Sequence, residues 1–184
     1  MKIFYWSPFT SQVATIKAVI NSAYGLKKCF NFETVLINAF GEWNQFSKDI
    51  KSKKIKIINN KKNRNINFTS GYLNSRIAFI KIFLHSFLFL KKNLLEKKPD
   101  YLVIHLITSL PLILFLLFKF DTKLILRISG LPKLNIFRKI LWRLSNKKIK
   151  FVTTPTKETY KELKKMNIFD NSKIHVLPDP VFIE

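Results

Sequence analysis

The sequence has few of the residues that build disulfide-linked, metal-bound or repetitive structures. Its 184 residues include a single cysteine, Cys29, so no internal disulfide can form, which fits a reducing compartment. The 4 glycines and 7 prolines are too few for a collagen-like or linker-like chain. No cluster of cysteine and histidine has metal-ligand spacing, so we expect no metal site and no bound cofactor.

Several catalytic signatures are also missing. There is no G-x-G-x-x-G fingerprint, no Walker A motif and no G-x-S-x-G elbow, which argues against a standard dinucleotide enzyme, a P-loop enzyme and an α/β-hydrolase. No cleavable signal peptide is visible, because residues 1–6 are strand-like and no small-residue cleavage site follows. The Asn67-Phe68-Thr69 sequon therefore carries little weight.

Acidic residues are scarce as well. The chain has 11 Asp and Glu against 33 Lys and Arg, a formal net charge of +22. Such a charge attracts anionic partners: a membrane face, a nucleic acid or a phosphorylated substrate. The joint richness in Lys, Asn, Ile and Phe is also what an AT-rich genome produces without selection for binding. Nucleic acid is the least favoured partner, because neither an RNA-binding aromatic motif nor a DNA-reading helix is evident.

What the chain does contain is 47% hydrophobic residues, enough for a core, in alternating strand-like and helix-like segments. Helical segments separate the strands, which predicts crossover connections within a parallel sheet. We therefore expect one Rossmann-like, doubly wound α/β domain over residues 1–184, with about six or seven strands and helices on both faces. The expected strands are 3–6, 33–40, 54–58, 101–105, 123–128, 150–153 and 173–177. The expected helices are 13–26, 76–95, 108–119, 133–145 and one that begins at Thr154-Pro155, and residues 59–75 form a long loop.

The apolar run 101–118 is long enough to cross a membrane. However, His105 and the sequence Thr108-Ser109-Leu110-Pro111 interrupt it, and the latter resembles a helix start. We interpret the run as a buried strand followed by a buried helix.

In such sheets, ligands bind beyond the carboxyl ends of the strands, so the loops after Trp6, His105 and Ile128 are the candidate sites. The first loop begins a helix whose free N–H groups attract phosphate or sugar hydroxyls. Its alternative role is an ordinary cap and turn. The candidate binding residues of this loop are Ser7, Phe9, Thr10, Ser11 and Gln12.

The other two loops supply the remaining candidates. His105 ends a strand and suits a general base or a clamp on a substrate hydroxyl, although a half-buried structural histidine is the alternative. Arg127 is placed to bind a phosphate, or else forms a surface ion pair. Thr108, Ser129 and Gly130 flank these two residues.

The segment 133–148 predicts an amphipathic basic helix. Its composition suits a helix on an anionic membrane surface, with Trp142 as an interfacial anchor. The alternative is a helix packed on the sheet through Leu134, Phe137, Ile140, Leu141 and Leu144, with a solvated basic side. The candidate membrane-surface residues are Arg138, Lys139, Trp142, Arg143, Lys147 and Lys148.

The order of the pieces resembles the N-terminal domain of the family-4 retaining glycosyltransferases, which have a B-type fold of two Rossmann domains. The segments that carry this resemblance are KIFYWSPFTSQ, KKPDYLVIH, LILRISGLP, FVTTPTKETYKEL and KIHVLPDPV, in that order. By position, His105 is similar to the family's histidine that contacts the transferred sugar. The first loop departs from the family, because Phe9-Thr10-Ser11 stand where a glycine pair is common.

The resemblance implies an acceptor-side domain that acts when completed by a C-terminal donor-binding domain, which this sequence does not contain. The chain is then a fragment, a split-gene product or a remnant. The implied partners are a nucleotide sugar, a glycan or lipid-linked acceptor of the cell envelope, and the inner face of the membrane, which places the protein in the cytoplasm. The alternative is a non-catalytic membrane-surface or partner-binding module.

Overall fold

The structure is a computed structural model that describes residues 1–9, 15–60, 72–131 and 134–182. Seven strands form one sheet in the order β3-β2-β1-β4-β5-β6-β7, and every neighbouring pair is parallel. The predicted Rossmann-like α/β fold is confirmed. The strands are β1 (Lys2–Trp6), β2 (Glu33–Asn38), β3 (Lys56–Asn59), β4 (Tyr101–Ile104), β5 (Lys123–Arg127), β6 (Ile149–Thr154) and β7 (Ile174–Val176).

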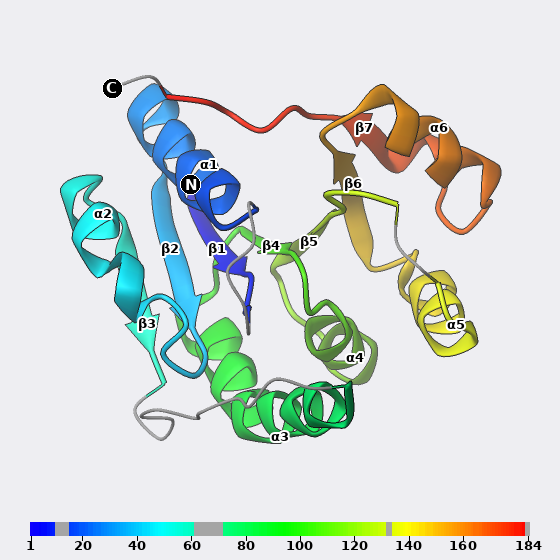
Figure 1. The fold of residues 1–184 in the computed structure, drawn as a ribbon, viewed down its shortest axis with the longest axis horizontal. Helices are drawn as coiled ribbons and strands as arrows, with labels where there is room; N and C mark the ends of the chain where they lie inside the picture. The colour runs from blue at the N-terminus through cyan, green and yellow to red at the C-terminus, as the bar shows by residue number, and fades with distance from the viewer. Residues whose placement is uncertain (10–14, 61–71, 132–133, 183–184) are drawn as a thin grey trace.

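Helices cover both sides of the sheet (Figure 1). They are α1 (Thr15–Phe30), α2 (Ser47–Ser52), α3 (Tyr72–Lys97), α4 (Ser109–Leu117), α5 (Ile136–Ser145) and α6 (Lys157–Lys165), with short 3-10 turns η1 (Asn44–Phe46) and η2 (Asn171–Lys173). One core cluster lies under α3, α4, α5 and α6, and a second under α1 and α2. This division follows from right-handed crossovers, because the chain moves one way along the sheet from β1 to β3 and the other way from β3 to β7.

The apolar run 101–118 divides into β4 and α4, as predicted. Thr108 is the N-cap of α4, and Leu110, Leu112 and Leu114 are fully buried. No helix among the described ranges is both long enough and apolar enough to span a bilayer.

Two local predictions are wrong, and one helix was not foreseen. Helix α3 begins at Tyr72, inside the expected loop 59–75, of which residues 61–71 lie outside the described ranges. Helix α6 is capped by Thr156, whose side chain accepts from the N–H of Thr159, because Thr154 still belongs to β6. Helix α2 was not expected, since its six residues are too few to show a helical period.

Candidate functional site

The candidate site forms where β4 ends. His105 follows β4 directly, and its N–H donates to the carbonyl of Trp6 at 2.9 Å. The indole N–H of Trp6 donates to the carbonyl of Ile107 at 2.8 Å, which ties the loop to the end of β1. Between them, Leu106 has a φ of 60°, a strained left-handed conformation for a branched residue. The loop geometry is therefore imposed by the neighbouring strand, a condition common at binding sites.

The His105 side chain is buried but has no partner. It is 2% exposed, and neither ring nitrogen has a hydrogen bond within the described structure. Burial and, to a smaller extent, the charge of Arg127 lower its pKa to about 4, while the charge of Asp179 opposes this shift. The imidazole is therefore neutral at pH 7 and presents one N–H donor and one acceptor nitrogen. Leaving such a group without a hydrogen bond is unfavourable, so a hydrogen bond from the imidazole to a ligand hydroxyl would stabilise the complex.

A cavity of about 170 Å³ opens beside His105, and a second of about 200 Å³ shares four of its lining residues. The shared residues are Leu106, Thr108, Arg138 and Trp142. The predicted site residues that line the first cavity are His105, Thr108, Arg127, Ser129 and Gly130. The structure thus brings together the predictions made for the loops after β4 and β5.

Two further polar groups of these cavities were missed by sequence reasoning. The indole nitrogen of Trp142 and the hydroxyl of Ser109 are buried and have no partner in the described structure. Trp142 lines both cavities, and Ser109 lines the second. The predicted role of Trp142 as an interfacial anchor is wrong, because this side chain is buried and packs on Phe169 with ring centroids 5.3 Å apart.

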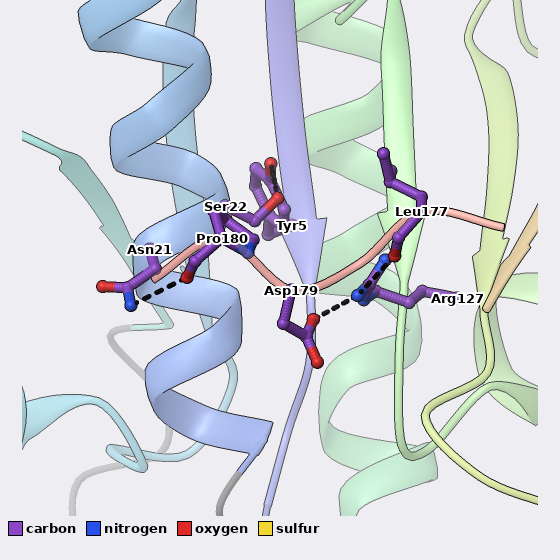
Figure 2. A network of polar contacts seen from close by, with 7 residues as sticks. All are labelled: Tyr5, Asn21, Ser22, Arg127, Leu177, Asp179 and Pro180. Atoms are coloured by element: carbon purple, nitrogen blue, oxygen red, sulfur yellow. Dashed lines mark hydrogen bonds and ion pairs between the residues drawn. The ribbon is translucent and has the colours of Figure 1, made fainter. Parts of the chain in front are cut away.

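Arg127 lines the first cavity but is already paired. Its Nη2 donates to the carbonyl of Leu177 at 3.3 Å and forms an ion pair with the carboxylate of Asp179 (Figure 2). Both predicted roles are therefore corrected: Arg127 is no surface residue, and its guanidinium holds the chain after β7 rather than an open phosphate position. The segment Leu177–Phe182, which we call the strap, runs from β7 back to α1 (Figure 1).

The first loop contributes less than predicted. Ser7 is buried, and its hydroxyl has no partner in the described structure, so it stays a candidate. Phe9 is not a substrate-facing residue, because it is buried in the core with its ring centroid 5.0 Å from that of Trp43. Thr10, Ser11 and Gln12 lie outside the described residues.

A buried carboxylate follows β2 at the same edge of the sheet. Glu42 accepts the N–H groups of Ala39 and Phe40, both at 2.9 Å. Burial raises its pKa to about 7, although these backbone donors favour the charged form. One acidic residue in an apolar loop forms no pattern, so sequence analysis could not single it out.

Helix α5 has its apolar residues on the outside. Ile136 is 80% exposed, and Phe137, Ile140 and Leu144 are exposed as well. The predicted packing through Phe137, Ile140 and Leu144 is therefore wrong, because α5 packs through Leu141, Trp142 and Ser145 instead. Of the predicted membrane-surface residues, the exposed ones are Lys139, Arg143, Lys147 and Lys148, whereas Arg138 is half-buried and lines both cavities.

Comparison with known proteins places this geometry in context. No protein-family model matches the sequence, and no curated protein does either. Among solved structures, UDP-GlcNAc 2-epimerase from Neisseria meningitidis, bound to UDP-GlcNAc, matches 96% of the chain with a TM-score of 0.64 and 14% identity. A glycosyltransferase from Rickettsia africae matches 96% with a TM-score of 0.64 and 13% identity. The chain has the Rossmann-like fold of B-type glycosyltransferases.

A further similar structure is the lipopolysaccharide outer core galactosyltransferase WaaB in its apo form. It matches 100% of the chain with a TM-score of 0.56 and 13% identity. The matched region is 46%, 42% and 47% of these three proteins, so the chain spans about half the length of each. The resemblance seen in the sequence is thus confirmed for the fold.

Proposed function

We propose that the chain is the acceptor-side domain of a glycosyltransferase, which transfers a sugar from a nucleotide sugar to a cell-envelope or lipid-linked acceptor. A donor-binding domain completes it, and it works in the cytoplasm at the inner face of the membrane. The observation that carries the proposal is the buried, unpartnered His105 beside a cavity at the carboxyl ends of β4 and β5. The likeness to structures of sugar-transferring and nucleotide-sugar enzymes supports it.

In this proposal His105 acts as a hydrogen-bonding clamp. Its pKa of about 4 makes it a weak base at neutral pH, so it serves poorly as a general base. A neutral imidazole instead orients a sugar hydroxyl, while Ser109 and the Trp142 N–H offer further polar contacts. Arg127 does not contact substrate in this proposal, because its guanidinium is engaged by Asp179.

The test uses the chain together with a donor-binding domain, UDP-GlcNAc as donor and a detergent extract of cell envelopes as acceptor. We expect no sustained UDP release from the chain alone. His105→Ala should lower the rate of the pair by about 10²-fold, as for loss of one well-placed hydrogen-bonding group. His85→Ala is the matched control, since His85 is an exposed histidine on α3. Turnover by the chain alone, or full activity of His105→Ala, would sink the proposal.

A second function, that of a membrane-surface module, is supported by α5. Exposed apolar residues and exposed cations share this helix, which is the composition of an interfacial helix. The two functions are compatible, because a lipid-linked acceptor is reached from the membrane surface.

A further inference from the structure

Arg138 lies apart from the exposed cations of α5. It is half-buried and lines both cavities beside His105, whereas Lys139 and Arg143 on the same helix are exposed. Among the residues that the structure describes, no acidic side chain lines either cavity. A guanidinium in such a wall favours an anionic group as the occupant.

Helix α4 begins at the second of these cavities, the one of about 200 Å³, through Thr108 and Ser109. The Thr108 side chain makes no capping hydrogen bond, and the first turn of α4 contains no acidic residue. The first N–H groups of a helix carry a partial positive charge and donate readily to an anion when no side chain caps them. The start of α4 therefore favours the same kind of occupant as Arg138.

Two buried polar groups in the walls of the second cavity lack hydrogen bonds. Trp142 is 3% exposed, and its indole nitrogen has no partner among the described residues. The hydroxyl of Ser109 is likewise buried and without a described partner. An indole N–H can only donate, and a buried donor without an acceptor is unfavourable. The occupant should therefore bring acceptor oxygens.

These donors belong to two different helices. Thr108 and Ser109 stand at the start of α4, while Arg138 and Trp142 belong to α5. A phosphate offers oxygens in several directions and about 1.5 to 2 negative charges at pH 7, so it suits this arrangement better than a planar carboxylate. The second cavity also shares lining residues with the cavity of His105, so one molecule can reach both.

We infer that the second cavity binds a phosphate group of the acceptor, which makes the acceptor a phosphorylated sugar, either free or linked to a lipid. The inference rests on the proposed function, in which His105 holds the acceptor hydroxyl. Arg138 pairs with the phosphate, while the start of α4 and the Trp142 indole donate to its oxygens.

The probes are glucose 1-phosphate, glucose and glucuronate, each titrated into the chain alone and followed by NMR of the indole N–H groups. Glucose 1-phosphate should shift the Trp142 resonance saturably and leave that of Trp43 in place. Trp43 is the internal control, because its indole nitrogen is also buried without a described partner but belongs to the other core cluster. Glucose and glucuronate should bind about tenfold more weakly or worse.

Arg138→Gln should weaken the binding of glucose 1-phosphate about tenfold or more, because a charge-assisted hydrogen bond is lost. Arg143→Gln is the matched control, since it removes the same charge from an exposed position of the same helix. Equal weakening by both variants, a Trp142 resonance that does not move, or glucose or glucuronate binding as tightly as glucose 1-phosphate would overturn the inference. The Trp142 resonance is followed in the unaltered chain, so the test stands even if Arg138→Gln fails to fold.

A fourth probe, farnesyl phosphate in detergent micelles, identifies the source of the phosphate. Displacement of glucose 1-phosphate by tighter binding of farnesyl phosphate assigns the site to a lipid-linked acceptor, and weaker binding assigns it to a soluble sugar phosphate; both results support a phosphate site.

Inorganic phosphate separates this inference from the proposed function. Its binding to the chain alone should survive His105→Ala, which lowers sugar transfer by the completed enzyme. A chain that binds phosphate but transfers no sugar when completed refutes the proposed function alone. A completed enzyme that transfers sugar although the chain binds no phosphate refutes this inference alone.

Discussion

The guanidinium of Arg127, at the end of β5, holds the carboxylate of Asp179 in the strap (Figure 2). The Arg127 side chain is 8% exposed and that of Asp179 is 33% exposed, so the two charges lose unequal amounts of water. Beyond this pair, Asn21 on α1 donates to the carbonyl of Pro180 at 3.1 Å, and Phe182 packs on Tyr24. The strap is thus fixed at both ends across the carboxyl edge of the sheet.

Because Arg127 is more buried than Asp179, substitutions of the two residues should lower the free energy of unfolding by different amounts. Asp179→Asn leaves a buried guanidinium without its counter-charge and should lower the free energy of unfolding by about 2 kcal/mol. Arg127→Met leaves a partly hydrated carboxylate and should lower it less. Urea denaturation measures both. Lys98→Met is the matched control, because its pair with Asp121 is exposed on both sides and should contribute almost nothing. A larger loss from Arg127→Met than from Asp179→Asn would contradict this account.

Arg127 and Asp179 shift the pKa of His105 in opposite directions. Arg127 lowers the pKa of His105 and Asp179 raises it, both less strongly than burial lowers it. Asp179→Asn should therefore lower this pKa further, and Arg127→Met should raise it. An NMR titration of the imidazole resonances tests the signs, and shifts in the same direction for both variants would refute the electrostatic cause.

His105 also makes stability depend on pH. Its pKa is about 6.5 in the unfolded chain and about 4 in the folded one, so the unfolded chain binds more protons between these values. The contribution of His105 is complete above pH 6.5 and is lost as pH falls towards 4. His105→Asn should remove this dependence. Urea denaturation at several pH values from 4 to 7 should show the wild type gaining stability over the variant as pH rises.

The pH dependence of stability that Glu42 causes has the opposite sign to that of His105, over an overlapping pH range. Its pKa rises from 4.5 to about 7 on folding, so the folded chain binds more protons and stability is lost as pH increases from 4.5 to 7. In the wild type the two dependences largely cancel. Glu42→Gln should therefore expose the rise of stability with pH that His105 causes. It also replaces one acceptor by a donor facing a backbone N–H, which costs about 1–3 kcal/mol. A Glu42→Gln variant with a flat profile would contradict the assigned protonation.

The sheet could be predicted because each strand is a short apolar run and each crossover is long enough for a helix. The position of His105 directly after β4 could be predicted because a strand's carboxyl end is read directly from the sequence. The Arg127–Asp179 pair could not, since its partners are 52 residues apart and nothing local signals it. The orientation of α5 could not either, because its apolar residues occur on more than one side. The buried side of α5 is set by its tertiary contacts: the helix packs against α4, and Trp142 packs against Phe169. Leu141 and Trp142 therefore lie inside.

That orientation changes what is expected at a membrane. Phe137 and Ile140 are among the exposed apolar residues of α5 that could enter the interface, whereas Trp142 is buried. The exposed charge comes from Lys139, Arg143, Lys147 and Lys148. Each cation near an anionic bilayer contributes about 1 kcal/mol, fading beyond about 8 Å at physiological salt. Changing these four cations to Gln should therefore lower the affinity for phosphatidylserine vesicles about 100-fold or more, as measured by co-sedimentation.

A matched set on α6 separates membrane contact from net charge. Lys157, Lys161, Lys164 and Lys165 carry the same number of charges on a helix without exposed large apolar residues. If net charge alone drives binding, this second set of Gln substitutions will weaken it as much as the first. If α5 lies on the bilayer, the α6 set will have a small effect. Phe137→Asn with Ile140→Asn will then weaken binding at high salt, where the electrostatic attraction is screened and apolar insertion is what remains. Equal pelleting with phosphatidylcholine vesicles alone would exclude the electrostatic contribution of α5.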